Sequence, residues 1–287
     1  MNEPRYPYLH VDVSSEEAEL VSASLFELGA LGVEERDAST LHKPAGGAAV
    51  TLVASFADDA AATAARGELG AYEARIEHVV GDEWRDGWRK YWKPFRASQR
   101  LVVVPSWEEY EPSARDLVLR LDPGQAFGTG THETTQLLLN ELESRVEQGV
   151  RVLDIGTGSG ILSIAALLLG ADSALAIDND PLAVDATREN AERNELADRL
   201  QASGALLDDV TEQFPLVIAN IEARVLTPHA AAIAARVAPG GLLLLSGLLA
   251  TDVADVRAAY RAFEELARPE RGDWRALVLR APGAAEG

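Results

Sequence analysis

The sequence contains no cysteine and only one methionine. Without cysteine the chain forms no disulfide, offers no thiolate nucleophile and builds no zinc-thiolate site. Its five histidines are scattered, and none has the spacing typical of metal ligands. We therefore expect a protein that binds no metal.

Long apolar runs and basic residues are also scarce. No apolar stretch reaches the roughly 18 residues of a membrane span, and the N-terminus lacks a basic segment followed by an apolar run. The formal net charge of -20 argues against non-specific nucleic-acid binding, which needs a basic surface to displace counterions. We expect a cytoplasmic protein with neither a membrane nor a nucleic acid as partner. The acidity suits a basic partner, a salt-rich cytosol or simply solubility.

The chain is long enough for a main domain with a smaller companion. It has 287 residues, of which 47% are hydrophobic and 25% charged, a composition that buries a sizeable core. The patterns predict a first domain over residues 1–80, a linker helix over 81–96 and a second domain over 97–287.

Alternating and helical patterns in residues 1–80 predict a small α+β domain. A serine is expected to cap the first helix, and the order of strand, helix, strand, strand, helix, strand is typical of a ferredoxin-like domain. These elements are expected over 8–13, 14–29, 32–36, 48–56, 58–69 and 72–80. No catalytic constellation appears there, so the domain is interpreted as a recognition module, with a scaffold or dimerisation domain as the alternative.

The linker is rich in tryptophan. Trp84, Trp88 and Trp92 recur every four residues and share one face of the predicted helix, which Pro94 ends. This stripe is compatible with two roles. It can pack against one of the domains, or it can form an aromatic, basic surface for a protein partner.

From residue 97 strands and helices alternate. Continuous apolar strands between helices predict a parallel sheet covered on both faces, hence a seven-stranded Rossmann-like domain. The last strand, over 273–281, alternates as an antiparallel member would. One helix is expected over 224–238.

A glycine-rich turn, "LDIGTGSG" at 153–160, follows the first of these strands. Gly156, Gly158 and Gly160 allow a sharp turn and a close approach to a ligand at the next helix N-terminus. Asp154 precedes them, and its charge suits the cationic α-amino group of S-adenosylmethionine better than a pyrophosphate. Asp178, 22 residues beyond Gly156, is placed to accept ribose hydroxyls. A nicotinamide oxidoreductase with a drifted loop remains the alternative.

Asn220 lies at the end of a later strand, at the edge where such folds bind ligands. Its amide offers one acceptor and one donor, although an asparagine there can also simply form a turn.

Seven motifs together resemble the PrmA family. These are "WRDGWRKYWKPFR", "VVVPSW", "DPGQAFGTGTHETT", "VLDIGTGSGILSIAA", "AIDNDPLAV", "ANIEA" and "PGGLLLLSGLLATDV". The resemblance implies an S-adenosylmethionine-dependent methyltransferase that modifies α-amino and lysine ε-amino groups of protein eleven of the large ribosomal subunit. It also implies that the first domain grips the substrate and that the linker swings it.

The resemblance assigns roles to both glycine-rich segments. The segment 122–135 would fold over the cofactor, with Phe127 as a cover and Thr135 as a polar contact, while 153–160 would cradle the methionine end. Asn220 would be catalytic. The implied cofactor site comprises Phe127, Gly128, Thr129, Thr135, Asp154, Gly156, Gly158, Gly160, Asp178, Asn179 and Asn220.

No histidine or cysteine stands in these motifs as an obvious base, so we expect the amine to lose its proton to water. His132 is expected to brace the loop, with acid–base work as the alternative. The protein is expected to be a monomer. An electron-transfer-flavoprotein type of lysine methyltransferase and a non-catalytic cofactor-binding protein are the other functional alternatives.

Overall fold

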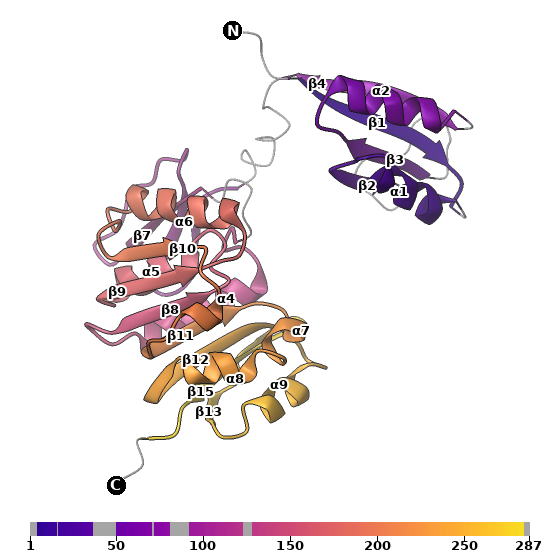
Figure 1. The fold of residues 1–287 in the computed structure, drawn as a ribbon. Helices are drawn as coiled ribbons and strands as arrows, with labels where there is room; N and C mark the ends of the chain where they lie inside the picture. The colour runs from indigo at the N-terminus through magenta and orange to yellow at the C-terminus, as the bar shows by residue number, and fades with distance from the viewer. Residues whose placement is uncertain are drawn as a thin grey trace. The chain divides into compact units, whose positions relative to one another are not determined.

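The computed structural model describes residues 5–15, 17–36, 50–70, 72–80, 92–122 and 128–283. The chain divides into two compact units, residues 1–92 and residues 93–287 (Figure 1). Each unit has its own sheet and is described by itself.

The N-terminal unit has a four-stranded antiparallel sheet with strand order β2-β3-β1-β4. Two helices pack on one face of this sheet around a core that includes Leu9, Leu25, Leu52 and Ala62. The elements follow the order predicted from the sequence. They are β1 (Arg5–Val13), α1 (Ala18–Glu27), β2 (Gly32–Arg36), β3 (Val50–Ser55), α2 (Asp59–Glu68) and β4 (Glu73–Val80).

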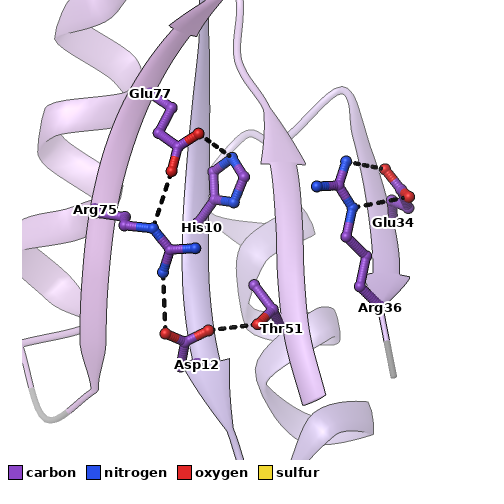
Figure 2. Close-up of polar contacts among 7 residues, drawn as sticks. All are labelled: His10, Asp12, Glu34, Arg36, Thr51, Arg75 and Glu77. Carbon is purple, nitrogen blue, oxygen red and sulfur yellow. Dashed lines mark hydrogen bonds and ion pairs between the residues drawn. The ribbon is translucent and has the colours of Figure 1, made fainter. Parts of the chain in front are cut away.

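The opposite face of this sheet carries a polar network (Figure 2). Asp12 accepts hydrogen bonds from Thr51 Oγ1 at 2.5 Å and from Arg75 Nη1 at 3.0 Å. Arg75 Nε donates to Glu77 at 3.0 Å, and His10 Nε2 lies 3.6 Å from the same carboxylate. His10 is buried, and this burial lowers its pKa. Alternation along the strands thus separates an apolar core from a face of paired charges.

The C-terminal unit is built on a mixed sheet. Five strands are parallel, and β15 pairs with β12 antiparallel, as the alternating pattern near the C-terminus predicts. The order is β10-β9-β8-β11-β12-β15-β13, and the short strand β14 also pairs with β15, which brings the sheet to eight strands. The strands are β8 (Arg151–Ile155), β9 (Ser173–Ile177), β10 (Leu200–Ser203), β11 (Phe214–Asn220), β12 (Val237–Leu249), β13 (Glu264–Ala267), β14 (Glu270–Arg271) and β15 (Trp274–Arg280).

Helices pack on the buried side chains of this sheet. One core cluster joins Val217, Leu243 and Leu277 of the sheet to Ile233 and Val256 of helices. Helix α4 packs against β12, β15 and α5, while α6 packs against β9 and β10. The helices are α4 (Glu133–Arg145), α5 (Ile161–Leu169), α6 (Pro181–Arg193), α7 (Ala223–Leu226), α8 (Ala230–Ala235) and α9 (Val253–Ala259). Within the described ranges, no helix has both the length and the apolar composition needed to cross a bilayer.

Two predicted helix starts or spans were wrong. The single helix expected over 224–238 is split into α7 and α8, and Pro228 lies between them. Proline has no N–H to donate, so the ladder of helical hydrogen bonds is interrupted at Pro228, although Thr227 before it keeps helical backbone. Helix α1 begins after Glu17, which makes no side-chain cap hydrogen bond, in place of the expected serine cap.

The linker helix predicted over 81–96 differs at its C-terminal end. Phe95–Arg96 forms the short strand β5, which pairs with β6 (Leu101–Pro105), and β6 in turn pairs with β7 (Leu117–Leu121). Residues 81–91, with two of the three tryptophans, lie outside the described residues, and Trp92 is buried.

Candidate functional site

The second glycine-rich segment forms a tight loop at the carboxyl end of β8. Gly156, Gly158 and Gly160 have φ angles of 70°, 58° and 81°, a region that L-residues with side chains rarely adopt. Gly160 is the N-cap residue of α5. A Cβ atom there would lie 2.9 Å from Thr187 Cγ2, so the loop packs directly on helix α6. The backbone therefore turns from strand into helix as a ligand-binding loop requires.

Asp154 lies beneath this loop and is 1% exposed. Its Oδ2 accepts hydrogen bonds from Thr157 Oγ1 at 2.9 Å and from Ser163 Oγ at 2.7 Å. Burial raises the pKa of this carboxyl to about 6, and the two hydroxyls counteract only part of that shift. Among the described residues, nothing donates a hydrogen bond to its Oδ1. A buried carboxylate oxygen without a donor fits a cationic group nearby.

Asp178 and Asn179 lie at the end of the neighbouring strand β9. The Asp178 carboxylate accepts from Gly158 N–H at 2.9 Å and from Asp180 N–H at 3.0 Å. A carboxylate has about four acceptor positions, so these bonds leave capacity for ligand hydroxyls. Both residues line a cavity of about 200 Å³, together with Ile155, Gly156, Ile177, Ala205, Leu206, Leu207, Ile221, Val225, His229 and Ile233.

Asn220 ends β11, the strand on the other side of β8. Its Nδ2 donates to Thr135 Oγ1 at 3.1 Å, and Thr135 is 1% exposed. Asn220 lines a second cavity, of about 500 Å³, with His132, Thr134, Ile221, Glu222, Val225, Gly247 and Trp274. Because Ile221 and Val225 line both cavities, the two cavities adjoin.

The first glycine-rich segment contacts the second. Ser159 Oγ donates to the carbonyl of Gly128 at 2.6 Å. A Cβ on Gly128 would lie 2.8 Å from that Oγ, and the φ of Gly128 is 108°. Thr129 Oγ1 lies 2.8 Å from Thr131 Oγ1 and so makes its contact within the segment. Phe127 lies outside the described residues.

His132 is the N-cap residue of α4. Its Nδ1 accepts from Thr134 N–H at 3.4 Å and lies 2.8 Å from Thr134 Oγ1. The imidazole packs edge-on against Trp274, with ring centroids 5.1 Å apart. The capping contacts and the packing on Trp274 hold the imidazole in place, as the loop-bracing interpretation requires.

Apart from Phe127, the structure thus gathers the predicted residues of both segments, of β8, of β9 and of β11 at one edge of the sheet. Sequence reasoning missed Leu206, Ile221, Gly247 and Trp274, which line the cavities. Leu206 follows β10 and Trp274 begins β15, so knowledge of the strand order would have been the only signal for them.

Comparison with known proteins agrees with this geometry. Residues 5–282 match the family "Ribosomal protein L11 methyltransferase (PrmA)". A relative from Sorangium cellulosum (strain So ce56), named ribosomal protein L11 methyltransferase, is 46% identical over 99% of this chain and 98% of its own length. Another of that name, from Pelotomaculum thermopropionicum (strain DSM 13744 / JCM 10971 / SI), is 44% identical over 78% of this chain and 74% of its own.

A solved structure supports the fold over two thirds of the chain. The crystal structure of ribosomal protein L11 methylase from Lactobacillus delbrueckii subsp. bulgaricus is similar with a TM-score of 0.62 and 35% identity, over 67% of this chain and 100% of that chain. The family match covers nearly the whole chain, and relatives of that name are similar over most of its length, so the family of the chain is established. The chain belongs to the ribosomal protein L11 methyltransferase (PrmA) family.

Proposed function

We propose that this chain transfers methyl groups from S-adenosylmethionine to the α-amino group and lysine ε-amino groups of ribosomal protein L11. The observation that carries the proposal is the pair of adjoining cavities at the carboxyl edge of the sheet, with Ile221 and Val225 in both walls. One cavity lies at the strand ends that bind nucleosides in doubly wound folds. The other opens beside Asn220, where an acceptor amine would enter.

The chain's residues fit the cofactor. Asp178 and Asn179 would hold the ribose, because their side chains line the smaller cavity. The unpartnered Oδ1 of Asp154 would stabilise the α-amino cation electrostatically from below the loop. When bound, S-adenosylmethionine supplies a methyl group on a positively charged sulfur.

The acceptor amine must be neutral to attack. A lysine with an ordinary pKa of about 10.4 costs about 4.6 kcal/mol to deprotonate at pH 7, and an α-amine of pKa near 8 costs about 1.4 kcal/mol. Of the described residues that line the larger cavity, His132 and Glu222 are titratable. The Nδ1 of His132 accepts the capping bond, its Nε2 lies 4.0 Å from Glu133 Oε2, and Glu222 pairs with Arg224, so we assign the proton to water.

Asn220 would orient the amine. Its Nδ2 is fixed by Thr135, which leaves the side-chain carbonyl as an acceptor for an amine N–H. Trp274, in the wall of the same cavity, offers an aromatic face for a methylated, cationic nitrogen.

We assign substrate recognition to residues 1–80, as a ferredoxin-like domain, and catalysis to residues 97–287, as a methyltransferase domain whose main sheet path, without the short strand β14, has seven strands. The element order and the strand order β2-β3-β1-β4 support the first assignment. We further propose that the protein acts as a monomer in the cytoplasm, and its net charge of -20 disfavours direct contact with nucleic acid.

The test is transfer of labelled methyl groups from S-adenosylmethionine to purified L11, with electron transfer flavoprotein as the competing substrate. The proposal expects label in L11 alone and little or none with Asn220→Ala. Label in the flavoprotein and not in L11 would move the substrate assignment while keeping the reaction. Binding of the cofactor without transfer to either protein would contradict the proposed activity.

A further inference from the structure

Two asparagines of helix α6 pair with the backbone at the end of β7. Asn194 accepts from Arg120 N–H at 2.9 Å and donates to Arg120 O at 2.7 Å. Asn190 does the same with Asp122, at 2.9 Å for each bond. The four residues from Asn190 to Asn194 rise about 6.0 Å in a helix, and the two residues from Arg120 to Asp122 rise about 6.6 Å in a strand. The spacing of the two asparagines therefore matches that of the two backbone positions. The two side-chain amides therefore take the place of a neighbouring strand.

Asn190 has a further attachment that Asn194 lacks. Its Nδ2 also donates to the carbonyl of Ser159 at 2.9 Å, and both residues are fully buried. Ser159 in turn holds the carbonyl of Gly128 through its Oγ at 2.6 Å. Asp122 and Gly128, two residues of the first glycine-rich segment, are thus tied to one residue of the second.

Helix α6 holds the second segment at a neighbouring point as well. Thr187, one turn earlier on the helix and fully buried, donates to the carbonyl of Gly158 at 2.9 Å. Helix α6 therefore holds two successive carbonyls of the loop, those of Gly158 and Ser159, and the N–H of Gly158 holds Asp178. A shift of α6 relative to this loop would move the carboxylate that faces the smaller cavity.

We propose that Asn190 is a positioning residue for cofactor binding, which sets the two glycine-rich segments in the relative position that the cofactor site requires. The inference rests on the proposed function, because it takes S-adenosylmethionine as the ligand. Asn194 is the matched control. It is the C-cap residue of the same helix and makes the same pair of bonds to the same strand segment, but within the described residues none of its hydrogen bonds reaches either glycine-rich segment.

The experiment compares full-length Asn190→Ala, Asn190→Asp and Asn194→Ala with the wild type. Calorimetry gives the Kd for S-adenosylmethionine, kinetics with L11 give KM for the cofactor and kcat, and thermal unfolding gives Tm. Asn190→Asp keeps the shape and the acceptor oxygen but cannot donate to Asp122 or Ser159. It keeps the inference testable if the alanine variant does not fold.

Both Asn190 variants should raise the Kd and KM for the cofactor about tenfold or more, with kcat at saturating cofactor within about threefold of wild type. Asn194→Ala should lower Tm but leave Kd within about threefold. Equal changes in Kd for the two positions, or an unchanged Kd in Asn190→Asp, would overturn the inference. Cofactor binding is measured without L11. If the Kd values change as expected but the wild type transfers no methyl group to L11, only the proposed substrate is contradicted.

Discussion

Replacement of Asp154 by asparagine should remove a pH dependence from cofactor binding. Burial raises the pKa of this carboxyl to about 6, and its Oδ1 has no donor among the described residues. If the cationic α-amino group binds only when Asp154 is ionised, affinity follows the ionised fraction. With a pKa of about 6 that fraction rises about fourfold between pH 5.5 and pH 7.5.

The raised pKa of Asp154 also predicts how the stability of the cofactor-free protein depends on pH. A folded-state pKa above the unfolded value of 3.8 gives a contribution to stability that is fully present below pH 3.8 and lost as the pH rises through about 6. A shift of about two units corresponds to on the order of 3 kcal/mol. Cofactor binding should offset this loss, because it supplies the missing positive charge.

The assay is titration calorimetry of S-adenosylmethionine binding at pH 5.5, 6.5 and 7.5, with denaturant unfolding of the cofactor-free protein at the same pH values. Asp154→Asn should bind more weakly at pH 7.5 and show a flatter profile. It retains all five histidines and so isolates the carboxylate. Parallel pH profiles in the two proteins, or wild-type affinity that does not rise with pH, would contradict a charge interaction between Asp154 and the cofactor.

Three further predictions concern single side chains. Asn220→Ala removes the bond to Thr135 and should lower kcat about 100-fold, because the acceptor amine is then misplaced. A decrease in kcat of less than about threefold in steady-state kinetics would contradict this role. His132→Ala should lose about 1 kcal/mol of unfolding free energy with its cap to Thr134 yet retain measurable turnover, and abolished turnover at unchanged cofactor affinity would exclude a bracing role. Because burial lowers the pKa of His10, its stabilising contribution is present above pH 6.5 and lost as the pH falls through the lowered value. Chemical unfolding of wild type and His10→Gln at pH 7.5 and 5.5 should show this contribution as the difference between the two pH dependences, because the contribution of Asp154 is common to both proteins.

The fold was predictable where one element has a strong pattern of its own. The apolar runs that became β8, β11 and β12 stand out in the sequence, and so does the proline that opens α6. β10 has the sequence "LQAS", which is too short and too polar to indicate a strand. It is a strand because it pairs with β9, and this pairing is not visible in the local sequence. The break between α7 and α8 was signalled by Pro228, but the alanine-rich pattern around it favoured a continuous helix.

The site was predictable in its glycine loop and less so in its walls. Asp154 and Asp178 follow from their positions at strand ends next to the glycines. Trp274 and Leu206 come to the cavities from strands far apart in sequence, and no local pattern marks them. The bonds of Asn190 are likewise invisible in sequence, because they depend on how α6 lies across the end of β7.

The most direct test of the proposed function is the intact mass of unmethylated L11 after incubation with the full-length protein and S-adenosylmethionine. The account predicts that the mass rises by whole methyl groups and that Asn220→Ala, folded and still binding cofactor, produces no comparable rise. An unchanged L11 mass in the presence of wild-type protein that binds the cofactor would contradict the assignment of L11 as its substrate.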